Sequence, residues 1–230
     1  MTGGTDGAGS TRSSPLGRPQ AILFDWDSTL VDNWLSIEHA VNATLAAMGH
    51  PAWSAEETRR RVRESMRDTF PRLFGDRWPE AREIFYQAFI EKHLEHLRPL
   101  GGAADMLAKL ADAGFFLGVV SNKQGTLLRK EAAHLGWTRH FRSLVGAGDA
   151  PRDKPDPAPV ALALADGSVA MGRDVWFVGD TALDMRCAIN AGCVPILIAG
   201  HASATDDFST ARPELEVVDW ASFSTLVLRA

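Results

Sequence analysis

The sequence predicts an α/β fold: a parallel sheet covered by helices on both faces, with an all-helical domain inserted after the first strand. Three observations support this fold class. From Gln20 onward, short apolar runs alternate with stretches of helical periodicity. About 90 residues separate the first two runs, far more than the usual connection within an α/β unit. Those residues show helical patterns and no convincing strand pattern, so the insertion should be helical.

Five apolar runs are expected to form the strands. A run of this kind bounded by turn signals is typical of a buried strand, and ligands of open α/β sheets bind just beyond the carboxyl ends of the strands. The five runs are Ala21 to Asp25, Phe115 to Ser121, Ser143 to Ala147, Asp174 to Asp180 and Val194 to Ala199. Between them, apolar residues from Leu127 to Leu135 predict a helix that ends at Gly136, and a second helix should run from Ala158 to Ala165.

The insertion is predicted to contain helices at Asn33 to His50, at Ser54 to Phe74, and one or two within Pro79 to Leu97. Ser54 and Glu57 have the spacing of a capping box at a helix N-terminus. The expected organisation is therefore a disordered tail at 1–19, a core domain at 20–33 and 99–230, and the helical domain at 34–98. The tail is rich in Gly, Ser and Thr and lacks the apolar core of a signal peptide.

Composition favours a soluble protein that binds neither membranes nor nucleic acids. Of the 230 residues, 45% are apolar and 23% charged, and no apolar stretch approaches the roughly 20 residues of a membrane span. The net charge of −5 gives no electrostatic reason to expect binding to a phosphate backbone. Cys187 and Cys193 are too few for a disulfide framework and are expected to be buried. A reducing compartment, the cytoplasm, fits these features.

Polar side chains follow several predicted strands at the point where each strand ends. Asp25 and Asp27 follow the first run, and Ser121 and Asn122 end the second. Lys154 precedes a proline, which biases it toward an extended conformation that can project its ammonium group toward a fixed point. Because the carboxyl ends of parallel strands meet at one edge of a sheet, these groups should lie together. They can hold phosphate oxygens and balance their charge.

Two further carboxylates join this edge. The fourth run ends at Asp180, and Asp184 follows one helical turn later if a helix begins there. Four acids in one place repel one another at neutral pH, so the site needs raised pKa values or a cation. A divalent metal is the simpler answer. Oxygen ligands without a local His and Cys set favour Mg²⁺, which commonly binds substrate phosphate.

In this order and context, the segments resemble the four motifs of the haloacid dehalogenase-like hydrolase superfamily. The resemblance covers roughly Gln20 to Gly200, and the insertion lies where the superfamily's helical cap of the phosphoglycolate phosphatase type would lie. It implies a Rossmann-like core with an inserted helical cap. The motifs are Asp25-Trp26-Asp27-Ser28-Thr29, Ser121, Lys154, and Gly179-Asp180 with Asp184. Ser28 departs from the glycine that is common at its position.

The resemblance also implies a role for each motif residue. Asp25 matches the nucleophile that forms an aspartyl-phosphate, and Asp27 matches the general acid and base. Ser121 and Lys154 match the groups that hold the phosphoryl oxygens, with Asn122 assisting through its amide.

The Mg²⁺ ligands implied by the resemblance are Asp25, the backbone carbonyl of Asp27, and Asp180. Asp184 would act directly, through water, or by orienting Lys154. Asp27 favours phosphate-ester chemistry, because the dehalogenases and phosphonate-cleaving members lack an aspartate at that position.

The expected function is Mg²⁺-dependent hydrolysis of a small phosphate monoester, phosphoglycolate-like or a sugar phosphate, by a monomer or homodimer. Two alternatives remain: a sugar phosphomutase of the β-phosphoglucomutase type, and a non-catalytic regulatory protein on the same fold. Arg63 and Arg67 are candidates for substrate specificity, because they share a helix face with Arg59. The competing interpretation is a solvated face on which these arginines pair with nearby glutamates.

Overall fold

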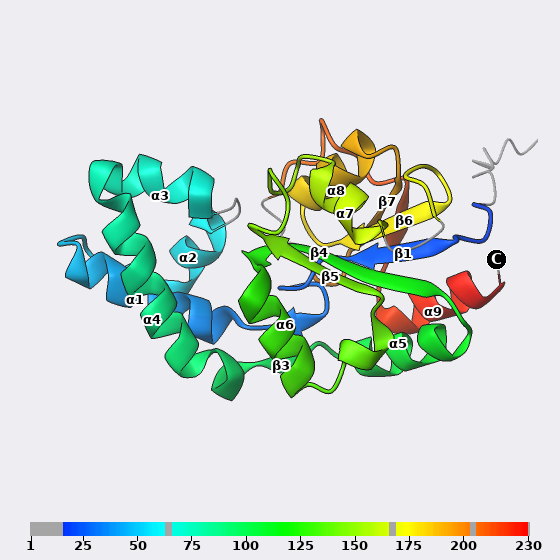
Figure 1. Ribbon diagram of the computed structural model, residues 1–230, viewed down its shortest axis with the longest axis horizontal. Helices are drawn as coiled ribbons and strands as arrows, with labels where there is room; N and C mark the ends of the chain where they lie inside the picture. Colours follow the sequence, from blue (N-terminus) through cyan, green and yellow to red (C-terminus); the bar gives the residue numbers. More distant parts are fainter. Residues whose placement is uncertain (1–15, 63–65, 166–168, 203–205, 230) are drawn as a thin grey trace, which may run out of the picture.

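The computed structural model describes residues 16–62, 66–165, 169–202 and 206–229. Its main sheet is parallel, with six strands in the order β5-β4-β1-β6-β7-β8 (Figure 1). The strands are β1 (Ala21–Phe24), β4 (Phe116–Gln124), β5 (Ser143–Ala147), β6 (Val175–Gly179), β7 (Val194–Ile198) and β8 (Leu215–Val217). The five predicted strands are confirmed within a few residues at their ends, and β8 is an additional edge strand.

Helices cover both faces of this sheet, as the fold class predicts. Successive side chains of a strand point to opposite faces. In β1, Ile22 and Phe24 therefore enter the apolar cluster on one face, while Ala21 and Leu23 enter the cluster on the other. The first face is covered by α5 (Ala103–Asp112), α6 (Gly125–His134) and α9 (Trp220–Arg229), and the second by α7 (Ala158–Ala163) and α8 (Ala182–Asn190).

The segment between β2 and β3 folds as a group of helices beside the sheet, which we call the helical unit (Figure 1). Side chains of its helices form a hydrophobic cluster separate from those of the sheet. Its elements are α1 (Trp34–Ala47), α2 (Ala55–Arg61), α3 (Met66–Phe74), the 3₁₀ turn η1 (Gly75–Arg77) and α4 (Trp78–His96). The unit thus contains only helices among its described residues.

One predicted helix of this unit is wrong in extent. The stretch from Ser54 to Phe74 forms two helices, because Val62 leaves helical geometry with φ −90° and ψ 82° and ends α2. The predicted capping box is confirmed: the Glu57 backbone N–H donates to the Ser54 hydroxyl at 3.1 Å, and the Ser54 N–H donates to the Glu57 carboxylate at 3.3 Å. This box sets the start of α2.

A two-stranded antiparallel sheet lies where the chain leaves the core and returns to it. It pairs β2 (Val31–Asp32) with β3 (Arg98–Pro99). Strands of two residues are too short for a readable alternation, so the sequence did not indicate them. The expected boundaries of the helical domain, at 34 and 98, lie at this junction.

The ends of the chain add packing that the sequence pattern did not predict. Most of the predicted tail lies outside the described residues, but at 16–19 the chain contacts the core, and the Arg18 guanidinium lies 4.6 Å from the ring centroid of Phe115. Trp220 and Phe223 of α9 pack against β1. Both cysteines are buried and free, as expected. Among the described helices, none combines the length and apolarity that crossing a membrane requires.

Candidate active site

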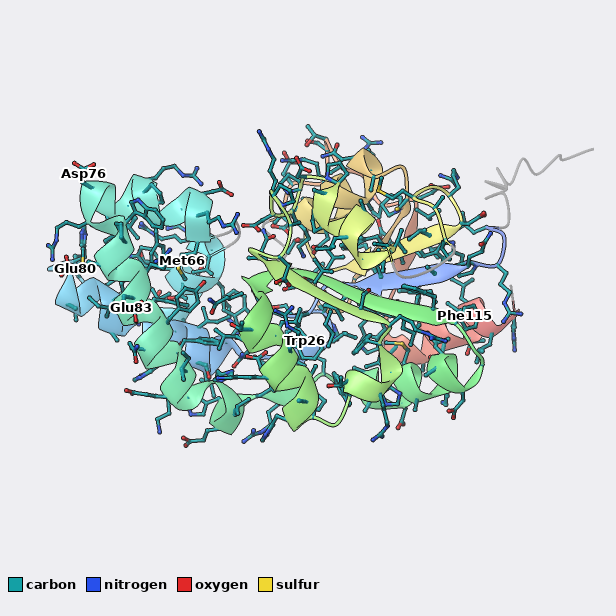
Figure 2. All side chains as sticks on the ribbon, viewed as in Figure 1. Trp26, Met66, Asp76, Glu80, Glu83 and Phe115 are labelled. Atoms are coloured by element: carbon teal, nitrogen blue, oxygen red, sulfur yellow. The ribbon has the colours of Figure 1, made fainter. Side chains whose placement is uncertain are left out.

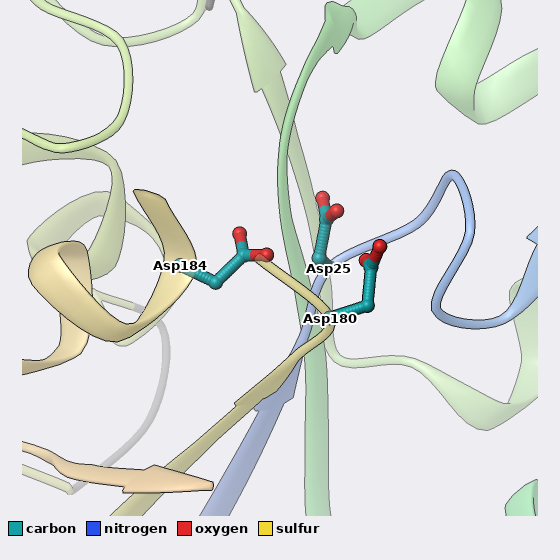
Figure 3. A group of neighbouring side chains, drawn as sticks. All are labelled: Asp25, Asp180 and Asp184. Carbon is teal, nitrogen blue, oxygen red and sulfur yellow. The ribbon is translucent and has the colours of Figure 1, made fainter. Parts of the chain in front are cut away.

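The predicted site residues gather at the carboxyl edge of the sheet, where the strand order reverses. Asp25 directly follows β1 and Asp180 directly follows β6, and these two strands are neighbours. From β1 the chain continues to β4 and β5 on one side and to β6, β7 and β8 on the other. Such a switch point is the usual ligand site of an open α/β sheet. Figure 3 shows the carboxyl groups of Asp25, Asp180 and Asp184 converging there.

Three buried carboxylates form the centre of the site. Asp25, Asp180 and Asp184 each offer an oxygen atom, and these atoms lie within 4.8 Å of one another. Burial raises the pKa of Asp25 to about 7, even though the nearby Lys154 ammonium acts to lower it. Burial also raises the pKa of Asp180 well above its usual value, and the charges of Asp184 and Asp25 add to this effect. The three carboxylates therefore need additional positive charge nearby if all of them are to be ionised.

Lys154 is the cation inside this cluster. Its Nζ donates to Asp25 Oδ1 at 2.6 Å and to Asp184 Oδ1 at 2.7 Å, and its side chain is only 3% exposed. Burial acts to lower the pKa of Lys154, but the carboxylates of Asp184 and Asp25 raise it, so the group is an ammonium. It lies where it can face the oxygens of a phosphoryl group attached to Asp25.

Two threonines fix the orientation of the other carboxylates. Thr29 Oγ1 donates to Asp180 Oδ1 at 2.7 Å. Thr181 is the N-cap of α8: its hydroxyl accepts from the Asp184 N–H at 3.2 Å and donates to Asp184 Oδ2 at 2.5 Å. The Thr181 N–H also donates to Asp184 Oδ2, at 3.1 Å, which completes a capping box. The cap leaves Asp184 Oδ1 directed at Lys154.

Asn122 positions the Lys154 segment. Its side-chain oxygen accepts from the Lys154 N–H at 2.9 Å, and its amide nitrogen donates to the Lys154 carbonyl at 3.2 Å. This pair of bonds connects β4 to the loop that carries the lysine. Ser121 is buried, and both Ser121 and Asn122 line the same cavity as Asp25 and Lys154. Direct binding of phosphate by their side chains stays a prediction.

Asp27 lies outside the carboxylate triad and has a cation of its own. Lys123 Nζ donates to Asp27 Oδ1 at 2.8 Å and also to both oxygens of Glu131, at 2.9 and 2.7 Å. Burial raises the pKa of Asp27, and the Lys123 ammonium opposes this rise. Sequence reasoning missed Lys123, although it directly follows the predicted pair at 121 and 122.

Glu131 anchors Lys123 from inside the protein. Its side chain has no exposed surface, and it accepts from Trp26 Nε1 at 2.7 Å and from Asn33 Nδ2 at 2.9 Å. His93 Nδ1 of α4 lies 2.9 Å from the same carboxylate. Burial acts to raise the pKa of Glu131, but Lys123 and the hydrogen bonds hold it below its usual value.

The Glu131 network joins the core to the helical unit, because His93 belongs to α4 and Glu131 to α6. Trp26, labelled in Figure 2, is fully buried and is more than a packing residue. A signal for Glu131 was present in the sequence, since an acid four residues after Leu127 and three after Leu128 falls within an apolar stripe.

Ser28 adopts the backbone conformation that usually calls for glycine. Its φ is 62°, in the left-handed region. Its hydroxyl accepts from Trp34 Nε1 at 2.7 Å, and the Arg59 guanidinium lies 4.9 Å from the centroid of the Trp34 ring. Ser28 thus ties the turn after Asp27 to the first helix of the helical unit.

Of the two arginines predicted to contribute to substrate specificity, the structure describes only Arg67. Arg63 lies outside the described residues. Arg67 Nε lies 3.5 Å from Asp153 Oδ2, and its side chain is 48% exposed. Arg59 and Arg61, rather than Arg67, contribute to the lining of the cavity that holds the carboxylates. Arg61, which was not among the arginines considered from the sequence, pairs with Glu57 at 3.3 Å.

The donor set fits a hard divalent cation. It consists of carboxylate oxygens without a thiolate or imidazole, and it is buried, so an ion would meet little competition from bulk water. Burial raises the pKa values of Asp25 and Asp180 although the Lys154 ammonium acts to lower both, so one lysine does not balance the charge of the three carboxylates. A divalent cation would supply that charge.

Comparison with known proteins supports the same interpretation. The family model described as haloacid dehalogenase-like hydrolase matches residues 22–198. The N-acetylmuramic acid 6-phosphate phosphatase of Pseudomonas aeruginosa is 33% identical over 181 residues, which cover 76% of this chain and 79% of that protein. A phosphoglycolate phosphatase of Xylella fastidiosa is 32% identical over 199 residues, covering 82% and 84%.

Solved structures share the fold. The crystal structure of a predicted phosphoglycolate phosphatase from Haemophilus somnus superposes with a TM-score of 0.80 at 20% identity, covering 90% of this chain and 97% of that one. At this identity the likeness shows the fold alone. The family match spans most of the chain, and the named sequence relatives are phosphatases, which confirms the predicted enzyme class. The chain therefore belongs to the haloacid dehalogenase-like hydrolases, in the branch that resembles phosphoglycolate phosphatase.

Proposed function

We propose that the protein is a Mg²⁺-dependent phosphomonoester hydrolase that works through an aspartyl-phosphate on Asp25. The observation that carries the proposal is the pairing of each catalytic carboxylate with its own buried lysine, Asp25 with Lys154 and Asp27 with Lys123. Asp25 and Asp27 thus have different charged neighbours. Different environments are what a nucleophile and a proton-transfer group require. We also propose that the helical unit, 34–98, is the cap of this enzyme.

In the first step, an Asp25 oxygen attacks phosphorus while the bond from phosphorus to the ester oxygen breaks. The carboxylic acid of Asp27 gives its proton to the leaving oxygen. Lys154, with Ser121, faces the phosphoryl oxygens and offsets the charge spread over them. The products of this step are the free alcohol and phosphorylated Asp25.

In the second step, the Asp27 carboxylate takes a proton from water, and the water oxygen attacks phosphorus. The bond from phosphorus to Asp25 breaks, which restores Asp25 and releases inorganic phosphate. Asp25, Asp180 and the backbone carbonyl of Asp27 would hold Mg²⁺, with Asp184 directly or through water. When bound, the cation neutralises charge on the carboxylates and the phosphoryl oxygens.

The test is release of inorganic phosphate from 2-phosphoglycolate and ethyl phosphate with Mg²⁺ and with EDTA. Release should require the metal and should be abolished in Asp25→Asn. Asp174→Asn is the matched control, because Asp174 lies on the surface before β6 and bonds only the side chain of Gln20 among the side-chain contacts described. Full activity of Asp25→Asn would refute the assigned nucleophile. A sugar phosphate that is isomerised without net phosphate release would identify a mutase instead.

A further inference from the structure

A cavity of about 440 Å³ extends from the catalytic carboxylates into the helical unit. Asp25, Asp27 and Lys154 line its catalytic end. The rest is lined largely by side chains of α1, α3 and α4, the region around Met66 in Figure 2. This volume lies in the range of small-molecule sites. The reacting phosphate and the interior of the helical unit therefore share one space.

Apolar side chains make up most of the lining of the part of the cavity inside the helical unit, and its described hydroxyl-bearing residues are Thr44, Thr69 and Tyr86. Val41, Leu45, Phe85 and Phe89 line it, and each is at most 9% exposed to solvent. Across the described residues, α1, α3 and α4 contribute no charged side chain to the lining. The Thr44 hydroxyl also lines it but donates to the Ala40 carbonyl of its own helix at 2.8 Å. We call this part the apolar chamber.

The cavity that contains the apolar chamber is large enough to hold the organic group of a small substrate. Protein interiors are close-packed and contain few voids larger than a water molecule. An apolar cavity of about 150 Å³ already binds benzene. The chamber is part of a considerably larger cavity, whose catalytic end is reserved for phosphate by the charges of Asp25 and Lys154.

Among the described lining residues, the cations already have partners, which disfavours an anionic organic group in the chamber. Lys123 and Lys154 are each bonded to two carboxylates at the catalytic end. Among the described residues that line the cavity, the arginines are Arg59 and Arg61. Both belong to α2 and are exposed to solvent. A carboxylate placed between Leu45 and Phe85 would lose its hydration, and neither of these side chains could pair with it.

We propose that the apolar chamber binds an aliphatic or aromatic group of the substrate, so that the enzyme prefers phosphate esters of apolar primary alcohols over 2-phosphoglycolate. The proposal rests on the phosphatase function proposed above. The phosphate would lie at Asp25, and the organic group would extend between α1, α3 and α4. Burial of a phenyl group should then increase kcat/KM ten- to a hundredfold, mainly through a lower KM.

The experiment compares ethyl phosphate with 2-phenylethyl phosphate, two esters of primary alcohols that place the same chemical demand on the catalytic groups. We expect kcat/KM to be at least tenfold higher for the phenylethyl ester. Val41→Phe, which fills the chamber, and Leu45→Ala, which removes a contact, should each reduce the ratio of the two kcat/KM values. Met48→Ala should leave the ratio unchanged, because Met48 is buried in the same hydrophobic cluster but does not line the cavity.

Binding of 3-phenylpropylphosphonate and propylphosphonate, measured by calorimetry, separates this proposal from the phosphatase function. Tighter binding of the phenyl compound without any phosphate release from the esters would refute the phosphatase function and support the chamber. Phosphate release with equal kcat/KM for both esters would refute the chamber, because the helical unit's own side chains would then fill the space. An unchanged ratio in both Val41→Phe and Leu45→Ala would refute it as well.

Discussion

Lys123 Nζ lies 2.8 Å from Asp27 Oδ1, and the same ammonium group is held by the buried carboxylate of Glu131. This relationship orients the acid that is proposed to move protons. It also connects that acid to the helical unit, since His93 of α4 contacts the same Glu131 carboxylate. We therefore predict that Lys123 and Glu131 are positioning residues that act through Asp27.

We predict that Lys123→Gln impairs proton donation by Asp27 more than it impairs attack by Asp25. For ethyl phosphate, whose leaving group needs a proton, kcat/KM should fall about 10² to 10⁴-fold. For 4-nitrophenyl phosphate it should fall far less, because 4-nitrophenolate leaves without a proton. Lys130→Gln is the control, because Lys130 is an exposed lysine on α6, the helix that also carries Glu131. Equal losses for the two esters would show that Lys123 has only a structural role.

Glu131→Ala should lower the free energy of unfolding by about 3–5 kcal/mol. The substitution leaves the buried Lys123 with one partner fewer, and it removes the acceptor of Trp26 Nε1 and Asn33 Nδ2. Urea denaturation measures the change. Lys130→Ala, on the adjacent exposed position, should change the free energy of unfolding by less than about 0.5 kcal/mol. A comparable loss in the two variants would contradict the prediction.

Two capping boxes allow a matched comparison of stability and metal binding. Thr181→Ala and Ser54→Ala each remove the N-cap hydroxyl of a helix and should each cost about 1 kcal/mol of stability. Only Thr181 also bonds the side chain of Asp184, a member of the carboxylate triad. The Mg²⁺ concentration for half-maximal activity should therefore rise in Thr181→Ala alone. A similar rise in Ser54→Ala would show that the effect is general destabilisation.

The cysteines should be inert in the folded protein. Burial raises the pKa of the Cys187 thiol to about 12 and also raises that of Cys193. Because the thiolate is the reactive form, its fraction stays negligible as the pH rises to 9, and access is blocked as well. Titration with a thiol-reactive chromophore should detect no free thiol at pH 8 until denaturant is added, and then two. Rapid reaction of either thiol without denaturant would overturn this expectation.

The positions of the catalytic motifs at strand ends could be predicted from the sequence, because they depend on short local patterns. Asp25, Ser121 and Asp180 each follow or end a run of buried strand residues, and parallel strands bring such ends to one edge. The capping box of Ser54 and Glu57 at the start of α2 was equally readable, because the partners are three residues apart. The break at Val62 was not readable, since the apolar residues Val62, Met66, Phe70 and Leu73 keep a helical spacing across it.

The sequence by itself determined the α/β fold class, the helical insertion, and the strand ends that bear Asp25 and Asp180. Only the tertiary structure decided that Asp27 shares Lys123 with Glu131, a contact across 96 residues to the lysine, and that the helical unit encloses an apolar chamber. Periodicity shows which face of an element is buried. Partners that meet across elements, and the space left between them, depend on how the faces pack, which no local pattern encodes.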